Sequence, residues 1–325
     1  MQRKLRIGKL VFCALLITSV SLFFDFSSLH ALDFPAKPIN LVIPFGPGGG
    51  SDLAARTFVH LSTEIFGQPM IIQYKPGGGG AIGTEFVAQS KPDGYTLLFG
   101  HTSCNTILPL AEGRSKGLDD LATVSRINVE NNIYFAQASA PFKTIKEMIA
   151  WAKANPGKLS FGNVGVWSVS DFEWKWLEEK AGIKTRIVPY NGGGDALVGL
   201  LGGHVQVVMM TSSSGYPHMQ TGKLRPLAIC GPYPKTDPKI PSMKDEGYDT
   251  GLEGYWKGIL APKGTPRPII EKIAAGFKKM TENKQAIDSF AKLGNDFNYQ
   301  GPDEFYKYWK EDSRVYKEMV RLLKN

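Results

Sequence analysis

The sequence predicts an α/β protein of two lobes, with mostly parallel sheets arranged around a ligand cleft. Three observations lead to this prediction. Short runs rich in β-forming residues alternate with helical stretches along the chain, which is typical of parallel strands joined by helices. The chain of 325 residues, less the leader described below, is long enough for two cores, since single hydrophobic cores stop growing at about 250 to 300 residues. Glycine-rich loops separate several strands from the helices that follow them, and two such loops in each lobe would face the cleft.

The first 31 residues have the pattern of a secretory signal peptide. Basic residues within positions 1–9 precede an apolar run at 10–24, and a cleavage site follows Ala31. The apolar run is shorter than the roughly 20 residues that span a bilayer. We therefore expect export to the periplasm and removal of residues 1–31. An uncleaved N-terminal anchor is the alternative, because residues 29–31 make an imperfect cleavage site.

The first third of the chain alternates strands and helices. Apolar side chains recur every fourth residue after Leu53 and predict a helix, which Gly67 and Pro69 end. A second helix is expected at 82–90, before a turn at residues 92–94. Strands are expected at 39–45, 70–74 and 95–99.

The same alternation continues through the middle and the end of the chain. Middle strands are expected at 133–137, 159–162, 186–189 and 205–210, with helices at 144–154, 170–180 and 195–201. Later strands are expected at 224–229 and 256–261, and two helices end the chain. The middle third would form the second lobe.

Four glycine-rich loops stand directly before expected helix starts, at residues 44–52, 75–84, 162–171 and 189–195. Glycine lets the backbone approach a ligand closely, and the unpaired N–H groups of a helix start bind anions. A plain turn capped by Ser51 or Asp52 is the alternative for the first loop. Gly78, Gly80 and Gly83 match a dinucleotide pattern, but the next strand lacks the acidic residue that a ribose needs, so we expect no cofactor.

Composition excludes several classes of partner. The formal charge is +8 without a run of five to eight Lys or Arg residues, which favours anionic small ligands weakly and predicts no nucleic-acid binding. Cys104 and Cys230 remain after the leader, either as a disulfide or as two buried thiols. Neither lies in a metal-ligand spacing, so no metal is expected.

The sequence gives little support for catalysis. It contains no GxSxG nucleophile motif, and the histidines have no motif partners. The hydroxyl-rich run at residues 211–214 is expected to link the lobes rather than to attack a carbonyl. We expect no catalytic residue and no enzyme, with a secreted hydrolase as the less favoured alternative.

Several motifs together resemble the Bug/TctC family, the extracytoplasmic solute receptors of tripartite tricarboxylate transporters. The similarity covers nearly the whole chain after the leader. Its motifs are IPFGPGGGSD at 43–52, GQP at 67–69, KPGGGG at 75–80, PDGYTLL at 92–98, PYNGG at 189–193, GKLRPLA at 222–228 and APKGTP at 261–266.

The resemblance implies a type II periplasmic binding-protein fold that closes on its ligand. Lobe 1 would comprise residues 32–124 and 225–325, and lobe 2 residues 125–224. Carried over by motif, the implied ligand-binding residues are Phe45, Gly48, Gly49, Ser51, Asp52, Gly80, Ala81 and Thr84, facing Gly165, Ser168 and Asp195. Asp52 would cap its helix or meet an amine or hydroxyl of the ligand.

The sequence departs from the family pattern at two places. Trp167 stands where the family usually has a small residue, which suggests a reshaped pocket or stacking on an aromatic acid. Residues 111–121 lack the usual Tyr-Asp-Pro turn. The implied ligand is a small organic carboxylate, such as a di- or tricarboxylate or an aromatic acid. The implied partners are the transporter's membrane subunits, with the receptor itself a monomer; a ligand-sensing module for a sensor kinase is the alternative.

Overall fold

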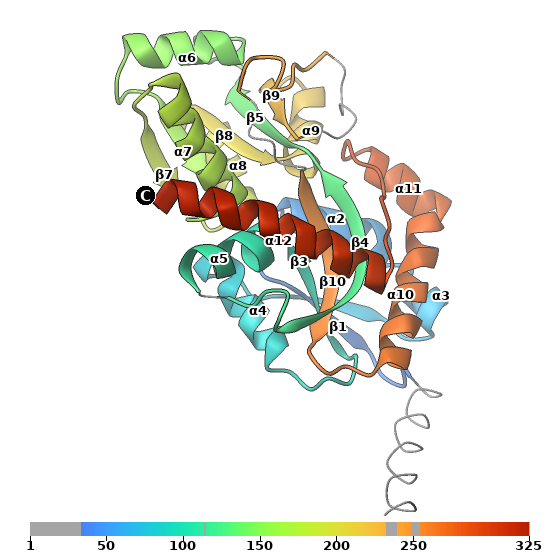
Figure 1. The fold of residues 1–325 in the computed structure, drawn as a ribbon. Coiled ribbons are helices and arrows are strands. Elements are labelled where there is room, and N and C mark those ends of the chain that lie inside the picture. Colours follow the sequence, from blue (N-terminus) through green and yellow to red (C-terminus); the bar gives the residue numbers. More distant parts are fainter. Residues whose placement is uncertain (1–33, 114, 232–238, 249–253, 325) are drawn as a thin grey trace, which may run out of the picture.

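Two five-stranded sheets organise the chain in a computed structural model, which describes residues 34–113, 115–231, 239–248 and 254–324. The strand order is β2-β1-β3-β10-β4 in the first sheet and β7-β6-β8-β5-β9 in the second. We call each sheet with its helices a lobe; lobe 1 lies below lobe 2 in Figure 1. The expected signal peptide, residues 1–31, lies outside the described residues.

The bounds of the elements follow the predicted alternation of strands and helices. Lobe 1 contains β1 (Ile39–Ile43), α2 (Gly50–Val59), α3 (Ser62–Phe66), β2 (Met70–Tyr74), α4 (Ala81–Ala88), β3 (Thr96–His101), α5 (Leu108–Glu112), β4 (Leu121–Glu130), β10 (Tyr255–Pro262), α10 (Arg267–Glu282), α11 (Lys284–Ala291) and the start of α12 (Pro302–Lys324). Lobe 2 contains β5 (Asn132–Gln137), α6 (Ile145–Ala154), β6 (Ser160–Asn163), α7 (Val169–Ala181), β7 (Arg186–Pro189), α8 (Gly193–Leu201), β8 (Val207–Thr211), α9 (Ser212–Gln220) and β9 (Leu224–Cys230).

Both sheets are mixed rather than mostly parallel, although the predicted α/β class with two lobes is confirmed. In lobe 1, β1 runs parallel to β2 and β3, whereas β10 runs antiparallel to β3 and β4. In lobe 2, β6 runs parallel to β7 and β8, whereas β5 runs antiparallel to β8 and β9. The antiparallel pairs involve the strands that carry the chain between the lobes, β4 to β5 and β9 to β10.

The chain changes sheets later than the sequence predicted. The expected boundaries at 124/125 and 224/225 fall inside β4 and at the first residues of β9. β4 pairs with β10 up to Glu130, and β9 pairs with β5 up to Cys230. The crossings therefore lie between Glu130 and Asn132 and between Cys230 and Tyr255.

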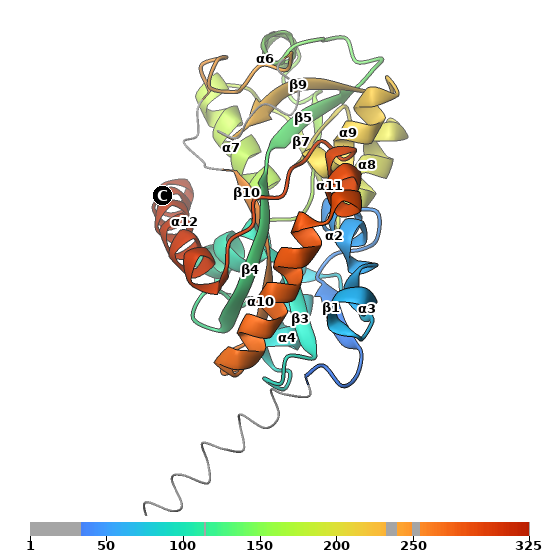
Figure 2. The same ribbon diagram turned by 90° about the vertical axis from the view of Figure 1, so that its right-hand side faces the viewer.

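Helices cover both faces of each sheet because alternate strand residues point to opposite faces. In lobe 1, Leu41 and Phe99 pack with α2 and α10, whereas Val42 and Leu98 pack with α4 and α12. In lobe 2, one face packs against α6 and α7 and the other against α8 and α9. Figure 2 shows α10 and α11 on one side of lobe 1 and α12 on another.

Helix α12 connects the two lobes. Near its start, Phe305 and Trp309 pack on Trp256 of β10, with ring centroids 5.1 and 5.2 Å away. Further along, Tyr316 lies 6.3 Å from Phe172 of α7, centroid to centroid. Figure 1 shows the helix running across the front of the molecule from lobe 1 to lobe 2.

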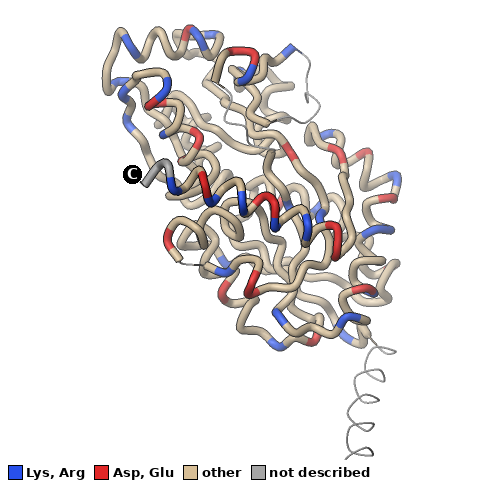
Figure 3. The backbone as a smooth tube through the Cα atoms, viewed as in Figure 1, with Lys and Arg blue, Asp and Glu red and all other residues tan. Residues whose placement is uncertain are grey.

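Charged residues of both signs are interspersed on the two lobes (Figure 3). Of the helices within the described part of the chain, none is long and apolar enough to cross a membrane. Cys104 and Cys230 are both buried as free thiols.

Candidate ligand-binding site

A cavity of about 50 Å³ lies between the lobes, where the starts of four helices meet. Lobe 1 lines it with residues of the 45–52 loop and α2, and lobe 2 with residues at the starts of α7, α8 and α9. A second hollow of about 220 Å³ shares Gly79 and Val164 with the first and is otherwise formed by loop residues of both lobes. The site thus has an inner cavity and an adjoining outer hollow.

Two of the four helices begin at glycines. The N-cap residues are Gly49 for α2 and Gly192 for α8, and neither helix has a side-chain cap. The first helical residues, Gly50 and Gly193, line the cavity. First-turn N–H groups have no partner within a helix, and a glycine has no side chain to cap them. These N–H groups, with about half a positive charge at each helix start, suit an anion.

The lobes touch through their backbones beside the cavity. A Cβ atom on Gly194 would lie 2.9 Å from the carbonyl oxygen of Pro47 and 3.3 Å from the nitrogen of Gly49. A Cβ atom on Gly50 would overlap the hydroxyl of Thr211. Glycine at these positions therefore permits an approach that any other residue would block, and the arrangement is a closed one.

Helix α7 begins differently, because its own side chains satisfy its first turn. Ser168, the N-cap, accepts a hydrogen bond from the Asp171 N–H. The Asp171 carboxylate accepts the Trp167 N–H at 2.9 Å and binds the Lys175 ammonium at 2.9 Å. This helix presents the hydroxyls of Ser168 and Ser170 to the cavity.

Asp52 holds the first loop together. Its carboxylate accepts hydrogen bonds from the Gly48 N–H at 2.8 Å, the Arg56 Nε at 2.8 Å and the Tyr74 hydroxyl at 2.7 Å. The charge of Asp52 is the largest cause that raises the pKa of Arg56. Of the two roles expected for Asp52, these contacts favour the structural one, although the residue also lines the cavity.

The structure brings together five of the twelve residues that the sequence suggested for the site. The predicted residues that line the inner cavity are Phe45, Gly49, Ser51, Asp52 and Ser168. Gly165 lies next to them in the outer hollow.

Six suggested residues lie away from the inner cavity. Gly80 packs so closely that a Cβ atom there would lie 2.7 Å from the Cβ of Cys104, and Ala81 and Thr84 follow it into α4. Gly48 turns its N–H toward Asp52.

The other two belong to lobe 2. Asp195 is exposed on α8. The start of this helix lines the cavity with Gly193 instead. Trp167 has a left-handed backbone, with φ of 59°, and its ring lies 5.3 Å from the Lys175 ammonium. Its ring therefore packs beside α7, and Trp167 does not line either hollow.

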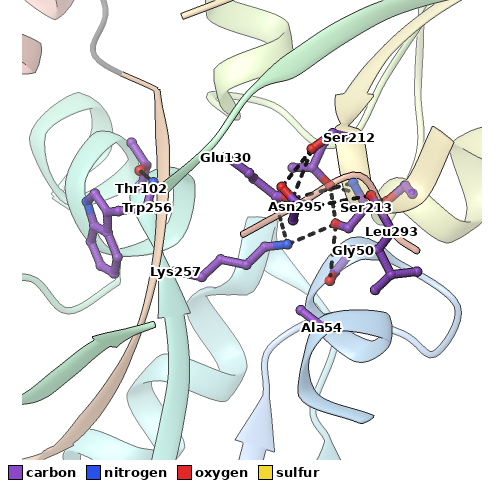
Figure 4. A network of polar contacts seen from close by, with 12 residues as sticks. Gly50, Ala54, Thr102, Glu130, Ser212, Ser213, Trp256, Lys257, Leu293 and Asn295 are labelled. Carbon is purple, nitrogen blue, oxygen red and sulfur yellow. Dashed lines mark hydrogen bonds and ion pairs between the residues drawn. The ribbon is translucent and has the colours of Figure 1, made fainter. Parts of the chain in front are cut away.

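Sequence reasoning missed a charged part of the cavity lining, Lys257, which forms a buried ion pair with Glu130 (Figure 4). Lys257 lines the cavity with a side chain that is 1% exposed, and its ammonium also donates to Ser213 Oγ at 3.2 Å. Burial lowers the pKa of Lys257, and the Glu130 carboxylate opposes that shift. The sequence did contain a signal for this pair, because Lys257 lies within the predicted buried strand 256–261 and a buried charge requires a partner of opposite charge.

His101 completes this part of the lining. Its ring lies between Phe45 and Tyr255, at centroid distances of 4.7 and 4.9 Å. Burial, and then the charge of Lys257, hold the pKa of His101 well below its usual value. The imidazole is therefore neutral near pH 7.

The hydroxyl-rich run at 211–214 contacts lobe 1 from lobe 2. Ser213 Oγ donates to the Gly50 carbonyl at 3.5 Å, and Ser212 Oγ donates to Asn295 Oδ1 at 2.9 Å. The chain itself does not cross between the lobes here, since β8 and β9 belong to the same sheet. Within the described residues, no group of three or more His, Cys, Asp or Glu side chains could hold a metal ion.

Two α/β lobes joined by crossing strands, with helix starts from both lobes around one cavity, are the architecture of the periplasmic binding proteins. The chain belongs to the TctC family, the tripartite tricarboxylate transporter family receptors, whose model matches residues 54–324. This family consists of solute-binding receptors and not of enzymes. The predicted Bug/TctC membership is thereby confirmed.

Individual relatives agree with this assignment. Protein BugT of Bordetella pertussis is 31% identical over 296 residues, which cover 89% of this chain and 90% of BugT. The structure of the periplasmic binding protein BugD is 27% identical, with a TM-score of 0.84, and covers 89% of this chain and 98% of BugD. In fold alone, the chain is also similar to MatC of Rhodopseudomonas palustris, solved with bound malate, at 24% identity and a TM-score of 0.81, over 88% of this chain and 100% of MatC.

Proposed function

We propose that this protein captures a small organic carboxylate in the periplasm and delivers it, as a monomer, to the membrane subunits of a tripartite tricarboxylate transporter. The observation that supports this most is the meeting of two helix starts without side-chain caps, α2 from lobe 1 and α8 from lobe 2, at one cavity between the lobes. Family membership supports the transporter role. The pattern of residues 1–31 supports export.

The site has enough donors for useful affinity. A hydrogen bond to a charged group contributes roughly 1.5–3 kcal/mol. Micromolar binding requires about 8 kcal/mol, so four or five such bonds suffice even after the costs of ordering. The first-turn N–H groups of α2 and α8 offer this number, and the bonded hydroxyls of Ser168 and Ser170 leave one further O–H donor between them.

Closure of the lobes would complete the site. Gly49 of lobe 1 and Gly194 of lobe 2 lie close together. The starts of α2 and α8 can therefore both contact one ligand only when the lobes are closed. Opening where the chain passes between the two sheets, after Glu130 and before Tyr255, would admit the ligand, as in other hinged binding proteins. Binding energy would then stabilise the closed form.

The size of the site fits a ligand with a small head group. The inner cavity of about 50 Å³ has room for a carboxylate and a few further atoms, since one water needs about 10–15 Å³ on such a measure. The outer hollow of about 220 Å³ could take the rest of the ligand. It is lined by uncharged residues, among them Tyr190 and Asn191.

A thermal-unfolding screen of the protein without residues 1–31 tests the proposal. Mono-, di- and tricarboxylates, aromatic acids and acidic amino acids are each compared with the corresponding neutral amide. A carboxylate at about 100 times its Kd should stabilise the protein by roughly 2.7 kcal/mol, and its amide by much less. The proposal is wrong if no carboxylate shifts the transition and mass spectrometry finds none bound to the purified protein.

A further inference from the structure

Lys257 and Glu130 form a buried ion pair on the side of the cavity nearest the crossings between the lobes. The exposed fractions of the two side chains are 1% and 0%. Lys257 lies in β10, directly after the second crossing, and Glu130 is the last residue of β4, directly before the first. A fully buried pair of this kind often costs stability compared with apolar residues, so its presence at a cavity wall suggests a role beyond packing.

The ammonium of Lys257 has a donor to spare. A lysine has three N–H donors, and the structure assigns two of them, to Glu130 and to Ser213 Oγ at 3.2 Å. Lys257 lines the inner cavity that the first turns of α2 and α8 also line. A ligand anion in that cavity would therefore be near both the buried cation and the two helix starts.

Glu130 connects the same pair to lobe 2. Its carboxylate accepts hydrogen bonds from the Ser213 N–H and the Ser212 Oγ, each at 3.4 Å, in the first turn of α9. Both members of the ion pair thus belong to lobe 1 and both contact the start of a lobe 2 helix (Figure 4).

Ser213 extends the contact to the first loop. Its hydroxyl lies between the Lys257 ammonium and the Gly50 carbonyl, at 3.2 and 3.5 Å (Figure 4). Gly50 begins α2 and lines the cavity. Movement of lobe 2 away from lobe 1 would remove Ser213 from both partners.

We propose that Lys257 binds the anionic group of the ligand and that its bond to Ser213 makes this binding depend on closure of the lobes. This inference rests on the proposed function and adds a specificity-determining residue to it. The pair is neutral when the site is empty, because Glu130 balances Lys257. An arriving carboxylate gains a charge-assisted bond from the spare N–H of Lys257, a neutral amide gains a weaker bond, and a cationic group finds no acceptor there.

The alternative is that the ion pair only stabilises the fold at the crossings. A structural role would change the affinities for charged and neutral ligands alike. A binding role changes the discrimination between a carboxylate and its amide. The ratio of the two dissociation constants is therefore the informative measurement.

The test uses the protein without residues 1–31 and the sodium salts of acetate, succinate, citrate and benzoate, each paired with its neutral amide, in calorimetric titrations. The double variant Lys257→Met/Glu130→Gln removes both charges without leaving one buried and unpaired. We expect the Kd of the carboxylate that the unmodified protein binds to rise at least tenfold, and the Kd of its amide to change by less than about threefold. Circular dichroism checks that the variant is folded.

A second variant, Ser213→Ala, keeps the ion pair and removes only the hydroxyl between Lys257 and Gly50. We expect a three- to tenfold loss of carboxylate affinity and a smaller closed fraction in small-angle scattering at saturating ligand. Unchanged discrimination in the double variant overturns the inference and leaves the proposed function standing. If the double variant does not fold, unchanged affinity in Ser213→Ala overturns it instead. Absence of binding by the unmodified protein counts against the proposed function itself.

Discussion

The two walls of the cavity differ in how the sequence encodes them. The glycine wall consists of two short continuous segments, residues 45–52 and 192–194. The charge of Asp52 in this wall is balanced by Arg56. The charged wall is Lys257, which lines the cavity, together with its partners Glu130 and Ser213, which do not; the three residues come from β10, β4 and α9. A local loop motif therefore provides the shape and the N–H groups, whereas the topology of the fold provides the charge.

The largest effect is expected from blocking the glycine wall. Gly194→Val places a side chain against the Pro47 carbonyl of the other lobe, so closure is obstructed while each lobe still folds. We expect the affinity for the bound carboxylate to fall about 100-fold or more, because the closed state becomes a minor population. Calorimetric titration measures the affinity, and small-angle scattering measures the closed fraction.

Gly301→Val is the matched control. A Cβ atom on Gly301 would meet nothing within 4 Å, and the residue lies far from the cavity in the sequence, just before α12. Its affinity should equal that of the unmodified protein. Equal affinities for Gly194→Val and Gly301→Val would show that the contact between Gly194 and Pro47 is not needed for binding.

A smaller effect should come from removing one donor of the glycine wall. Gly193→Pro deletes the first N–H of α8 at a helix position that tolerates proline, whereas Gly193→Ala keeps the N–H and adds a Cβ atom 3.5 Å from Ser214 Oγ. We expect about tenfold weaker carboxylate binding for the proline variant and little change for the alanine variant. Similar dissociation constants for the two variants would mean that the N–H of residue 193 does not bind the ligand.

The smallest expected effect concerns stability at the charged wall. The pKa of His101 lies well below 6.5 in the folded protein, so below about pH 6.5 the unfolded chain takes up a proton that the folded protein does not. This contribution to stability is complete above pH 6.5 and declines as the pH falls toward the folded pKa, by at most about 1.4 kcal/mol per pH unit.

His101→Phe keeps a ring between Phe45 and Tyr255 but removes the titration. The difference in unfolding free energy between the variant and the unmodified protein should therefore depend on pH between 7 and 5, in favour of the variant at low pH. Urea unfolding at several pH values measures it. A difference that is constant with pH would show that His101 is protonated equally in both states.

Local patterns predicted most of the fold. The strands at 39–45, 70–74 and 133–137 agree closely with β1, β2 and β5, because apolar β-forming runs between turn residues identify buried strands. The helix expected from Leu53 begins earlier, at Gly50, and its N-cap is Gly49, so the alternative of a turn capped by Ser51 or Asp52 does not describe this helix start. The same helix ends at Val59, and a separate short helix follows.

What the sequence could not predict depends on contacts between distant residues. The antiparallel pairing of β10 with β3 and β4 follows from the second crossing, which no local pattern reveals. The partner of Lys257 lies 127 positions earlier, in β4. Trp167 was expected at the ligand, but its left-handed backbone and the neighbouring Lys175 place the ring beside α7 instead.

Helix α12 has a consequence for how opening can be observed. Its first turns are attached to Trp256 in lobe 1, while Tyr316 rests on Phe172 in lobe 2. When the lobes separate, the C-terminal half of this helix must either slide on α7 or leave it. A fluorescent probe at the end of α12, paired with one on α6, would therefore report each opening event as a change in distance, without any modification of the cavity.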